Sequence, residues 1–121
     1  MGQRERAYAP YSEYRVGAAV MSGSGKVYLG CNVENASYGL TMCAERVAVF
    51  RAVSEGETAI RAVVISVEAR EMPRPCGACL QVISEFAQDE DVPIMTVSGD
   101  NTYEIHKLRD YLPMPFRLEE D

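Results

Sequence analysis

Three cysteines and one glutamate stand in two short motifs whose residue types and spacing fit metal-dependent hydrolysis. The motif CAE begins at Cys43 and ends at Glu45, and the motif PCGAC contains Cys76 and Cys79. Three protein ligands leave the fourth tetrahedral position of Zn²⁺ open for water, whereas a structural zinc site normally closes with a fourth Cys or His. The spacing therefore predicts a catalytic zinc site held by Cys43, Cys76 and Cys79.

Glu45 lies two residues beyond a predicted ligand, which places a carboxylate near the metal but free to act as a base. Its expected work is to take a proton from water, deliver it to a ring nitrogen of the substrate and later protonate a departing amine. Three thiolates leave the zinc site with a net charge of about −1, which opposes lowering the pKa of the water. Arg46 is expected to donate to a ligand sulfur and offset that charge.

A structural zinc site or a redox site would explain fewer of the residues in these two motifs than a catalytic zinc site does. A CxxC motif alone is shared by redox sites and structural zinc ribbons. A structural zinc site needs a fourth ligand, and the free candidates, Cys31 and His106, show no paired spacing. A redox interpretation of Cys76 and Cys79 leaves the motif that begins at Cys43 unexplained.

Composition limits the class of protein. The chain has 121 residues, 47% of them hydrophobic, so we expect one domain, residues 1–121, around one core. A net charge of −6 argues against nucleic-acid and anionic-membrane partners. No run approaches the ~20 apolar residues that cross a bilayer, and no secretory signal is apparent at the N-terminus, so a soluble, cytoplasmic protein is expected.

The hydrophobic patterns predict alternating strands and helices in one mixed sheet with helices packed against it. Expected strands are 16–21 and 27–33, joined as a hairpin, then 62–67, 93–98 and 102–106, with helices over 43–54 and 77–88. Both helices open at the predicted ligand cysteines, where the positive end of a helix dipole favours thiolate. The run 62–67, rich in β-branched residues, is the expected centre of the sheet.

Four ordered segments resemble the small, homotetrameric, zinc-dependent cytidine deaminase family. They read YAPYSEYRVGAAV, GCNVENASYGLTMCAERVAVFRA, PCGACLQVISEF and LPMPFRLEE, and they span nearly the whole chain. The resemblance implies an α/β three-layer sandwich, a mixed sheet of about five strands with helices on both faces. It implies hydrolytic deamination of cytidine and 2′-deoxycytidine in pyrimidine salvage. It also implies one Zn²⁺ per subunit and a homotetramer whose active sites lie at subunit interfaces.

The resemblance also assigns roles to residues outside the zinc motifs. Asn32 and Glu34 match the pair that hydrogen-bonds the ribose 3′-hydroxyl, and Tyr14 stands where the family usually has a Phe near base and sugar. Ala44 matches a position whose backbone contacts the pyrimidine. Phe116 resembles the C-terminal aromatic residue that reaches the base in a neighbouring subunit.

Two positions depart from the family pattern. Leu80 stands where the family commonly has an Arg that shares in neutralising the thiolates, so only Arg46 is expected in that role. Only residues 1–7 precede the YAPYS segment, so the first helix is expected to be short or absent.

The sequence is compatible with other functions. Deaminases of blasticidin S share the two zinc motifs, although the CNVEN segment favours cytidine. A nucleic-acid-editing deaminase would need basic or aromatic insertions that are absent. A non-catalytic, zinc-stabilised binding module would have no use for Glu45.

Overall fold

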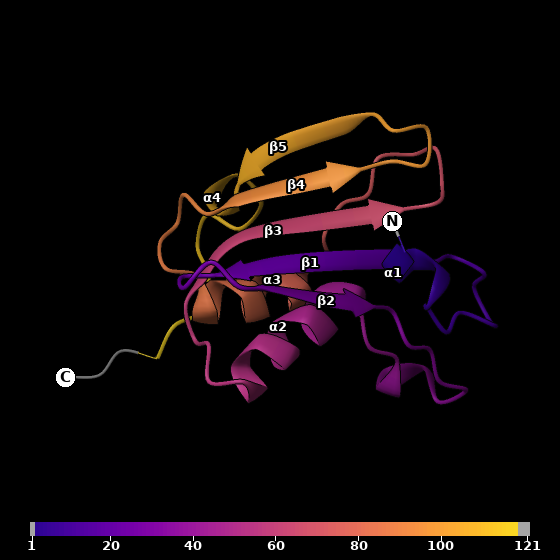
Figure 1. Cartoon of the computed structure of the whole chain (residues 1–121), viewed down its shortest axis with the longest axis horizontal. Coiled ribbons are helices and arrows are strands. Elements are labelled where there is room, and N and C mark those ends of the chain that lie inside the picture. The colour runs from indigo at the N-terminus through magenta and orange to yellow at the C-terminus, as the bar shows by residue number, and fades with distance from the viewer. Residues whose placement is uncertain (1, 119–121) are drawn as a thin grey trace.

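A five-stranded mixed sheet organises the computed structural model, which describes residues 2–118 (Figure 1). The strands are β1 (Val16–Ser22), β2 (Val27–Cys31), β3 (Ile60–Val67), β4 (Pro93–Val97) and β5 (Tyr103–Lys107). Their order is β2-β1-β3-β4-β5, with β3 and β4 parallel and every other neighbouring pair antiparallel. The predicted mixed sheet with its centre near 62–67 is confirmed.

Helices cover the two faces of this sheet unequally. The helices are α1 (Gly2–Glu5), α2 (Ala44–Ser54), α3 (Gly77–Phe86) and α4 (Leu108–Tyr111), with a 3-10 turn at Tyr38–Leu40. Side chains of α2, α3 and α4 join inward residues of β1, β3 and β4 in one buried apolar cluster. The opposite face carries α1, whose single turn crosses β1 (Figure 1). The first helix is thus short, as expected.

The predicted boundaries hold to within a few residues, and the differences have local causes. β2 ends at Cys31 instead of 33, because Val33 leaves the hairpin to form isolated bridges with Tyr8 and Met42. β3 starts at Ile60, two residues early, where a register shift lets it pair with Ser22. Within the described residues, no helix is long and apolar enough to cross a membrane. The last two residues of the LPMPFRLEE segment lie outside the described range.

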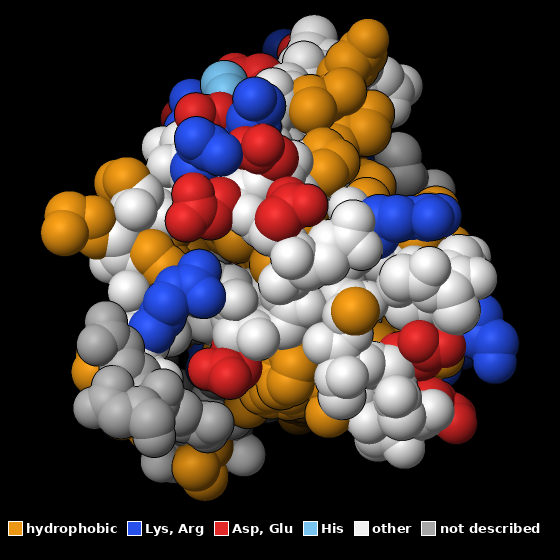
Figure 2. Space-filling model, turned by 90° about the vertical axis from the view of Figure 1, so that its left-hand side faces the viewer, with side chains coloured by type: hydrophobic (Ala, Val, Ile, Leu, Met, Phe, Trp, Pro, Cys, Tyr) orange, Lys and Arg blue, Asp and Glu red, His pale blue; other side chains and the backbone are white. Residues whose placement is uncertain are grey.

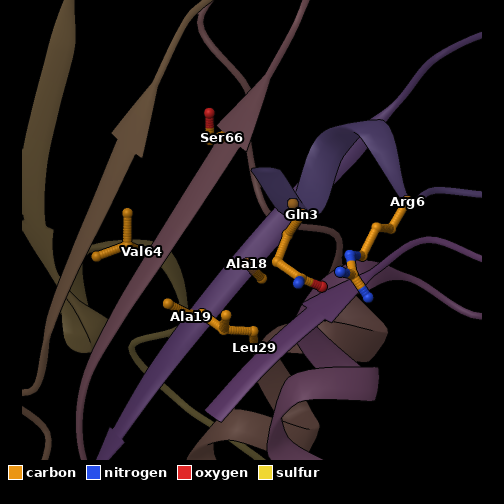
Figure 3. Close-up of a pocket in the computed structure, with 8 residues that line it drawn as sticks. Gln3, Arg6, Ala18, Ala19, Leu29, Val64 and Ser66 are labelled. Atoms are coloured by element: carbon orange, nitrogen blue, oxygen red, sulfur yellow. The ribbon is translucent and has the colours of Figure 1, made fainter. Parts of the chain in front are cut away.

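The face opposite α2 and α3 is apolar and largely open. One cross-strand row on it consists of Leu29, Ala19, Val64, Met95 and Ile105. A cavity of about 310 Å³ lies on this face, between the N-terminal residues and strands β1 to β3. Figure 3 shows the side chains that line it. The cavity contains no metal-ligating group.

Charged side chains lie at the end of the molecule that carries α4. Figure 2 shows acidic and basic groups gathered there beside apolar ones. Arg109 contacts Asp91 at 2.6 Å, with Glu90 and Lys107 nearby. These pairs are half exposed and contribute little to stability. They do not belong to the cluster of cysteines.

Two glycines let backbone segments approach each other closely near the helix and loop that carry the cysteines. A Cβ at Gly30 would lie 2.5 Å from the Ala48 nitrogen and 2.6 Å from the Ala44 oxygen, so α2 rests directly on β2. A Cβ at Gly99 would lie 1.8 Å from the Glu68 oxygen, so the loop after β4 presses against the loop after β3. Both contacts fix segments that lead to the motif cysteines.

The Gly30 contact generates a stability prediction. Gly30→Ala adds a methyl group that only a shift of α2 can accommodate, so we expect a loss of about 1–3 kcal/mol in the free energy of unfolding. Chemical denaturation measures it. Gly39→Ala is the matched control, because no atom lies within 4 Å of its added Cβ. Equal stabilities for the two variants would contradict the close approach of α2.

Candidate active site

The ends of two helices bring the motif cysteines together. Cys43 is the N-cap of α2 and Cys76 is the N-cap of α3, both with extended backbone angles. The Cys76 sulfur accepts the Cys79 backbone N–H at 3.3 Å. Unpaired N–H groups and the helix dipole make these positions favourable for negative sulfur. The predicted helix starts at the cysteines are confirmed.

The three sulfurs form a group that fits a metal ion. They all lie within 4.8 Å of one another. Zinc bound tetrahedrally to thiolates at about 2.3 Å separates two sulfurs by ~3.8 Å. Cys43 and Cys76 are 4.0 Å apart, while Cys76 and Cys79 are 3.0 Å apart. Zinc therefore needs the second pair to open by under about 1 Å.

The cysteines of this group differ in the pKa of their thiols. Donation from the Cys79 thiol, and then from Arg46, lowers the pKa of Cys43 to about 5. The hydrogen bond that the Cys79 thiol makes to Cys43, together with burial, raises the pKa of the Cys79 thiol. Of these two sulfurs, Cys43 is the one that loses its proton more readily. Because zinc binds thiolates, loading the site releases the proton of the Cys79 thiol.

Arg46 supplies positive charge beside the cluster. Its Nη2 donates to the Cys43 sulfur at 3.4 Å, and its Nε is buried without a partner among the described residues. Leu80, which follows the last cysteine, is 5% exposed and packs in the apolar core. The thiolates therefore receive no charge from position 80.

Glu45 is buried at the edge of the cysteine cluster. Only 6% of the residue is exposed. Burial raises the pKa of the Glu45 carboxyl, and the charge of Cys43 raises it further. A carboxyl whose pKa is shifted towards neutral exchanges protons more readily at physiological pH than an exposed one.

A cavity of about 280 Å³ opens over Glu45 and the sulfurs of Cys43 and Cys76. This size is near the lower end of the ~300–1,000 Å³ typical of small-molecule sites. Four of the five expected substrate contacts line it: Tyr14, Asn32, Glu34 and Ala44. The structure therefore brings together groups from the loop before β1, the loop after β2, the start of α2 and the loop before α3.

Asn32 and Glu34 both line the cavity, but they differ in their hydrogen-bond partners. The Asn32 residue is 8% exposed. Its side-chain oxygen accepts the Val16 backbone N–H at 3.0 Å, and its side-chain nitrogen donates to the Tyr14 backbone carbonyl at 2.8 Å. Glu34 accepts hydrogen bonds from Ser12, which lower the pKa of its carboxyl. Asn32 thus holds the start of β1 as well as lining the cavity.

Tyr14 and Phe116 are placed very differently relative to the cavity. Burial, followed by the charges of Glu71 and Glu45, raises the pKa of the Tyr14 hydroxyl, which keeps it protonated. Phe116 does not line the cavity of its own chain. Its backbone exchanges two hydrogen bonds with the Gln81 side chain, at 2.9 and 3.0 Å, while the residue stays 70% exposed.

Two residues that the sequence analysis missed also line the cavity. Ser12 contacts Glu34, and Arg74 forms an ion pair with Glu104 at 3.2 Å. Both lie in or beside motifs already singled out, YAPYS and PCGAC. Nothing in their residue types distinguishes them from surface residues, and only the folded loops show that they line the site.

The chain is similar to known proteins over most of its length. The sequence model of the cytidine and deoxycytidylate deaminase zinc-binding region matches residues 2–96. The cytidine deaminase of Sporosarcina psychrophila is 40% identical over 117 residues, which cover 97% of this chain and 85% of that protein. That of Halalkalibacterium halodurans is 47% identical over 98 residues, covering 80% of this chain and 74% of that protein.

Solved structures show the same similarity. A cytidine deaminase from Burkholderia pseudomallei superposes with a TM-score of 0.89 at 41% identity, covering 95% of this chain and 91% of that one. One from Mycobacterium tuberculosis gives a TM-score of 0.80 at 37% identity, covering 97% and 90%. The expected three-layer α/β fold is that of these proteins.

The Arg46 contact generates a prediction about metal affinity. Replacing Arg46 by Gln removes the positive charge beside Cys43, so we expect zinc affinity to fall about 10- to 100-fold, as for other groups that support metal ligands. Competition with a chromophoric chelator measures it. Arg51→Gln is the matched control, because Arg51 lies on the same helix and donates to the Leu29 oxygen. Equal affinities in both variants would remove Arg46 from this role.

Proposed function

This chain belongs to the cytidine and deoxycytidylate deaminases that share a zinc-binding region, and we propose that it hydrolyses cytidine and 2′-deoxycytidine to uridine and 2′-deoxyuridine, releasing ammonia. The observation that carries the proposal is the burial of Glu45 beside three sulfurs at the floor of a small cavity. Redox and structural uses of the cysteines do not explain this carboxyl.

Zinc is the cofactor, and the donor set of Cys43, Cys76 and Cys79 suits it. When bound, zinc lowers the pKa of water and so supplies a nucleophile at neutral pH. Glu45 would accept a proton from the attacking water and pass it to N3 of the cytosine ring as the C4–O bond forms. It would then take the proton of the new C4 hydroxyl and pass it to the amino group, which leaves as ammonia while the C4 carbonyl forms. Arg46 stabilises the thiolate of Cys43 throughout.

The remaining cavity residues bind the nucleoside in this proposal. The Ala44 backbone contacts the pyrimidine, and Tyr14 packs near base and sugar. Glu34 and Asn32 meet the ribose 3′-hydroxyl. The amide hydrogen bonds of Asn32 to Tyr14 and Val16 leave it one N–H and one lone pair for this purpose. The small cavity and the net charge of −6 favour a free nucleoside over a nucleic acid.

We further propose that residues 1–121 act as one deaminase domain of a cytoplasmic homotetramer, with active sites completed across subunit interfaces. The placement of Phe116 supports this arrangement. Its ring is exposed on a backbone that Gln81 fixes, and an exposed aromatic residue on a fixed backbone is a common interface anchor.

The role of Glu45 is tested by Glu45→Gln, which keeps the shape of the side chain but cannot shuttle protons. We expect zinc content and folding to be retained and kcat to fall at least about 10²- to 10⁴-fold. The measurement is the loss of cytidine absorbance, which a chelator should abolish in the unchanged protein. Glu55→Gln, an exposed residue at the end of the same helix, serves as control and should keep full activity.

The same assay separates the rival functions. Full activity in Glu45→Gln would exclude Glu45 from proton transfer. A zinc-loaded unchanged protein that turns over blasticidin S but neither nucleoside would belong to the rival substrate class. A zinc-loaded protein with no turnover on any of the three would be a binding module.

The shared active site is tested by mixing two kinds of impaired subunit, one without the Phe116 ring and one without the Glu45 carboxylate. We expect Phe116→Ala to lower kcat/KM about tenfold or more. In assemblies co-expressed with Glu45→Gln, some sites combine an intact Glu45 with a neighbour's Phe116, so activity should recover.

Mixtures of Glu45→Gln with Cys76→Ser should not recover, because both defects lie in one subunit's cavity. Met114→Ala, at a residue in the same tail that is even more exposed than Phe116, should stay active alone. Monomeric, fully active protein would contradict the proposal.

A further inference from the structure

The Glu34 carboxylate is held by a segment more than twenty residues away in the sequence. The backbone N–H groups of Tyr11 and Ser12 both donate to Oε1, at 3.0 and 3.1 Å. The Ser12 hydroxyl donates to Oε2. Each carboxylate oxygen has two acceptor positions, so these three donors leave one position free, on Oε2. Glu34 therefore has room for one further donor.

The Ser12 hydroxyl connects this carboxylate to the aromatic wall of the cavity. While its hydrogen is directed to Glu34, its oxygen accepts the Tyr14 backbone N–H at 3.0 Å. The Tyr14 carbonyl is in turn held by the Asn32 amide at 2.8 Å. One small side chain thus orients both Glu34 and the residue that bears the cavity's ring.

Ser12 and Glu34 both line the cavity over Glu45, so the free acceptor belongs to the ligand site. An ionised carboxylate accepts hydrogen bonds but donates none, and its hydrogen bonds are stronger than those between neutral groups. A group that offers one acceptor position, aimed by three donors, selects a single hydroxyl donor on the ligand. A sugar hydroxyl has this chemistry.

We propose that Ser12 is a positioning residue that aims the free acceptor of Glu34 at one sugar hydroxyl of the nucleoside. This inference rests on the proposed function, in which Glu34 meets the 3′-hydroxyl. Without the Ser12 hydroxyl, Oε2 gains a second free position and the carboxylate loses one of its three restraints. Recognition of the sugar weakens, whereas chemistry at the base, which Glu45 carries out, does not change.

The test compares two substrates that differ only in the 3′-hydroxyl, 2′-deoxycytidine and 2′,3′-dideoxycytidine. For Ser12→Ala we expect kcat/KM on deoxycytidine to fall roughly 10- to 100-fold, mainly through KM, with little change on the dideoxynucleoside. Ser12→Thr keeps the hydroxyl at an exposed position and should retain most of the activity. Ser24→Ala is the matched control, because it removes a serine donor to Glu57 in the β1–β2 turn, away from the cavity.

The outcomes distinguish this inference from the proposed function. Equal losses on both substrates would show that Ser12 only supports the loop, and no loss on deoxycytidine would show that it is not needed; either result overturns the inference. An unchanged protein that deaminates neither nucleoside would overturn the proposed function instead. Calorimetric titration of the same two nucleosides then decides the role of Ser12 from affinities alone, since a loss confined to deoxycytidine supports it and any other pattern does not.

Discussion

Mutual repulsion among three crowded sulfur atoms is the constraint on which the rest of this structure depends. Cys43, Cys76 and Cys79 lie within 4.8 Å of one another, and each tends towards negative charge when a metal is bound. The fold offsets this negative charge with the positive ends of two helix dipoles and with the guanidinium of Arg46. Placing helix starts beside each other requires α2 and α3 to lie on the same face of one sheet, and both pack there.

Consecutive residues of α2 then carry separate parts of the site. Cys43 caps the helix, Ala44 lines the cavity, Glu45 is buried beside the sulfurs and Arg46 contacts the Cys43 sulfur. Any displacement of the first turn of α2 moves all four together. The backbone contact with Gly30 is therefore as much a part of the site as the groups that line the cavity.

The sequence allowed most of the fold and the metal cluster to be predicted, because both depend on local patterns. The alternation of apolar residues indicated the strands, and the two cysteine motifs indicated their own helix starts. Ser12 and Arg74 could not be predicted, because their roles arise from contacts with Glu34 and Glu104, which are distant in the chain. The roles proposed for Glu34 and Phe116 came from resemblance, since an isolated carboxylate or aromatic residue has many uses.

The 3.0 Å separation of the Cys76 and Cys79 sulfurs has a consequence for the chain before it acquires metal. Two thiols this close need little movement to reach the bond length of a disulfide, about 2.0 Å. A disulfide between them would occupy two of the three sulfurs that bind zinc, and would leave Cys43 as the only free sulfur of the cluster. The order of events during maturation then matters: a chain that meets zinc first keeps its sulfurs, whereas one that meets an oxidant first needs a reductant before it can be loaded.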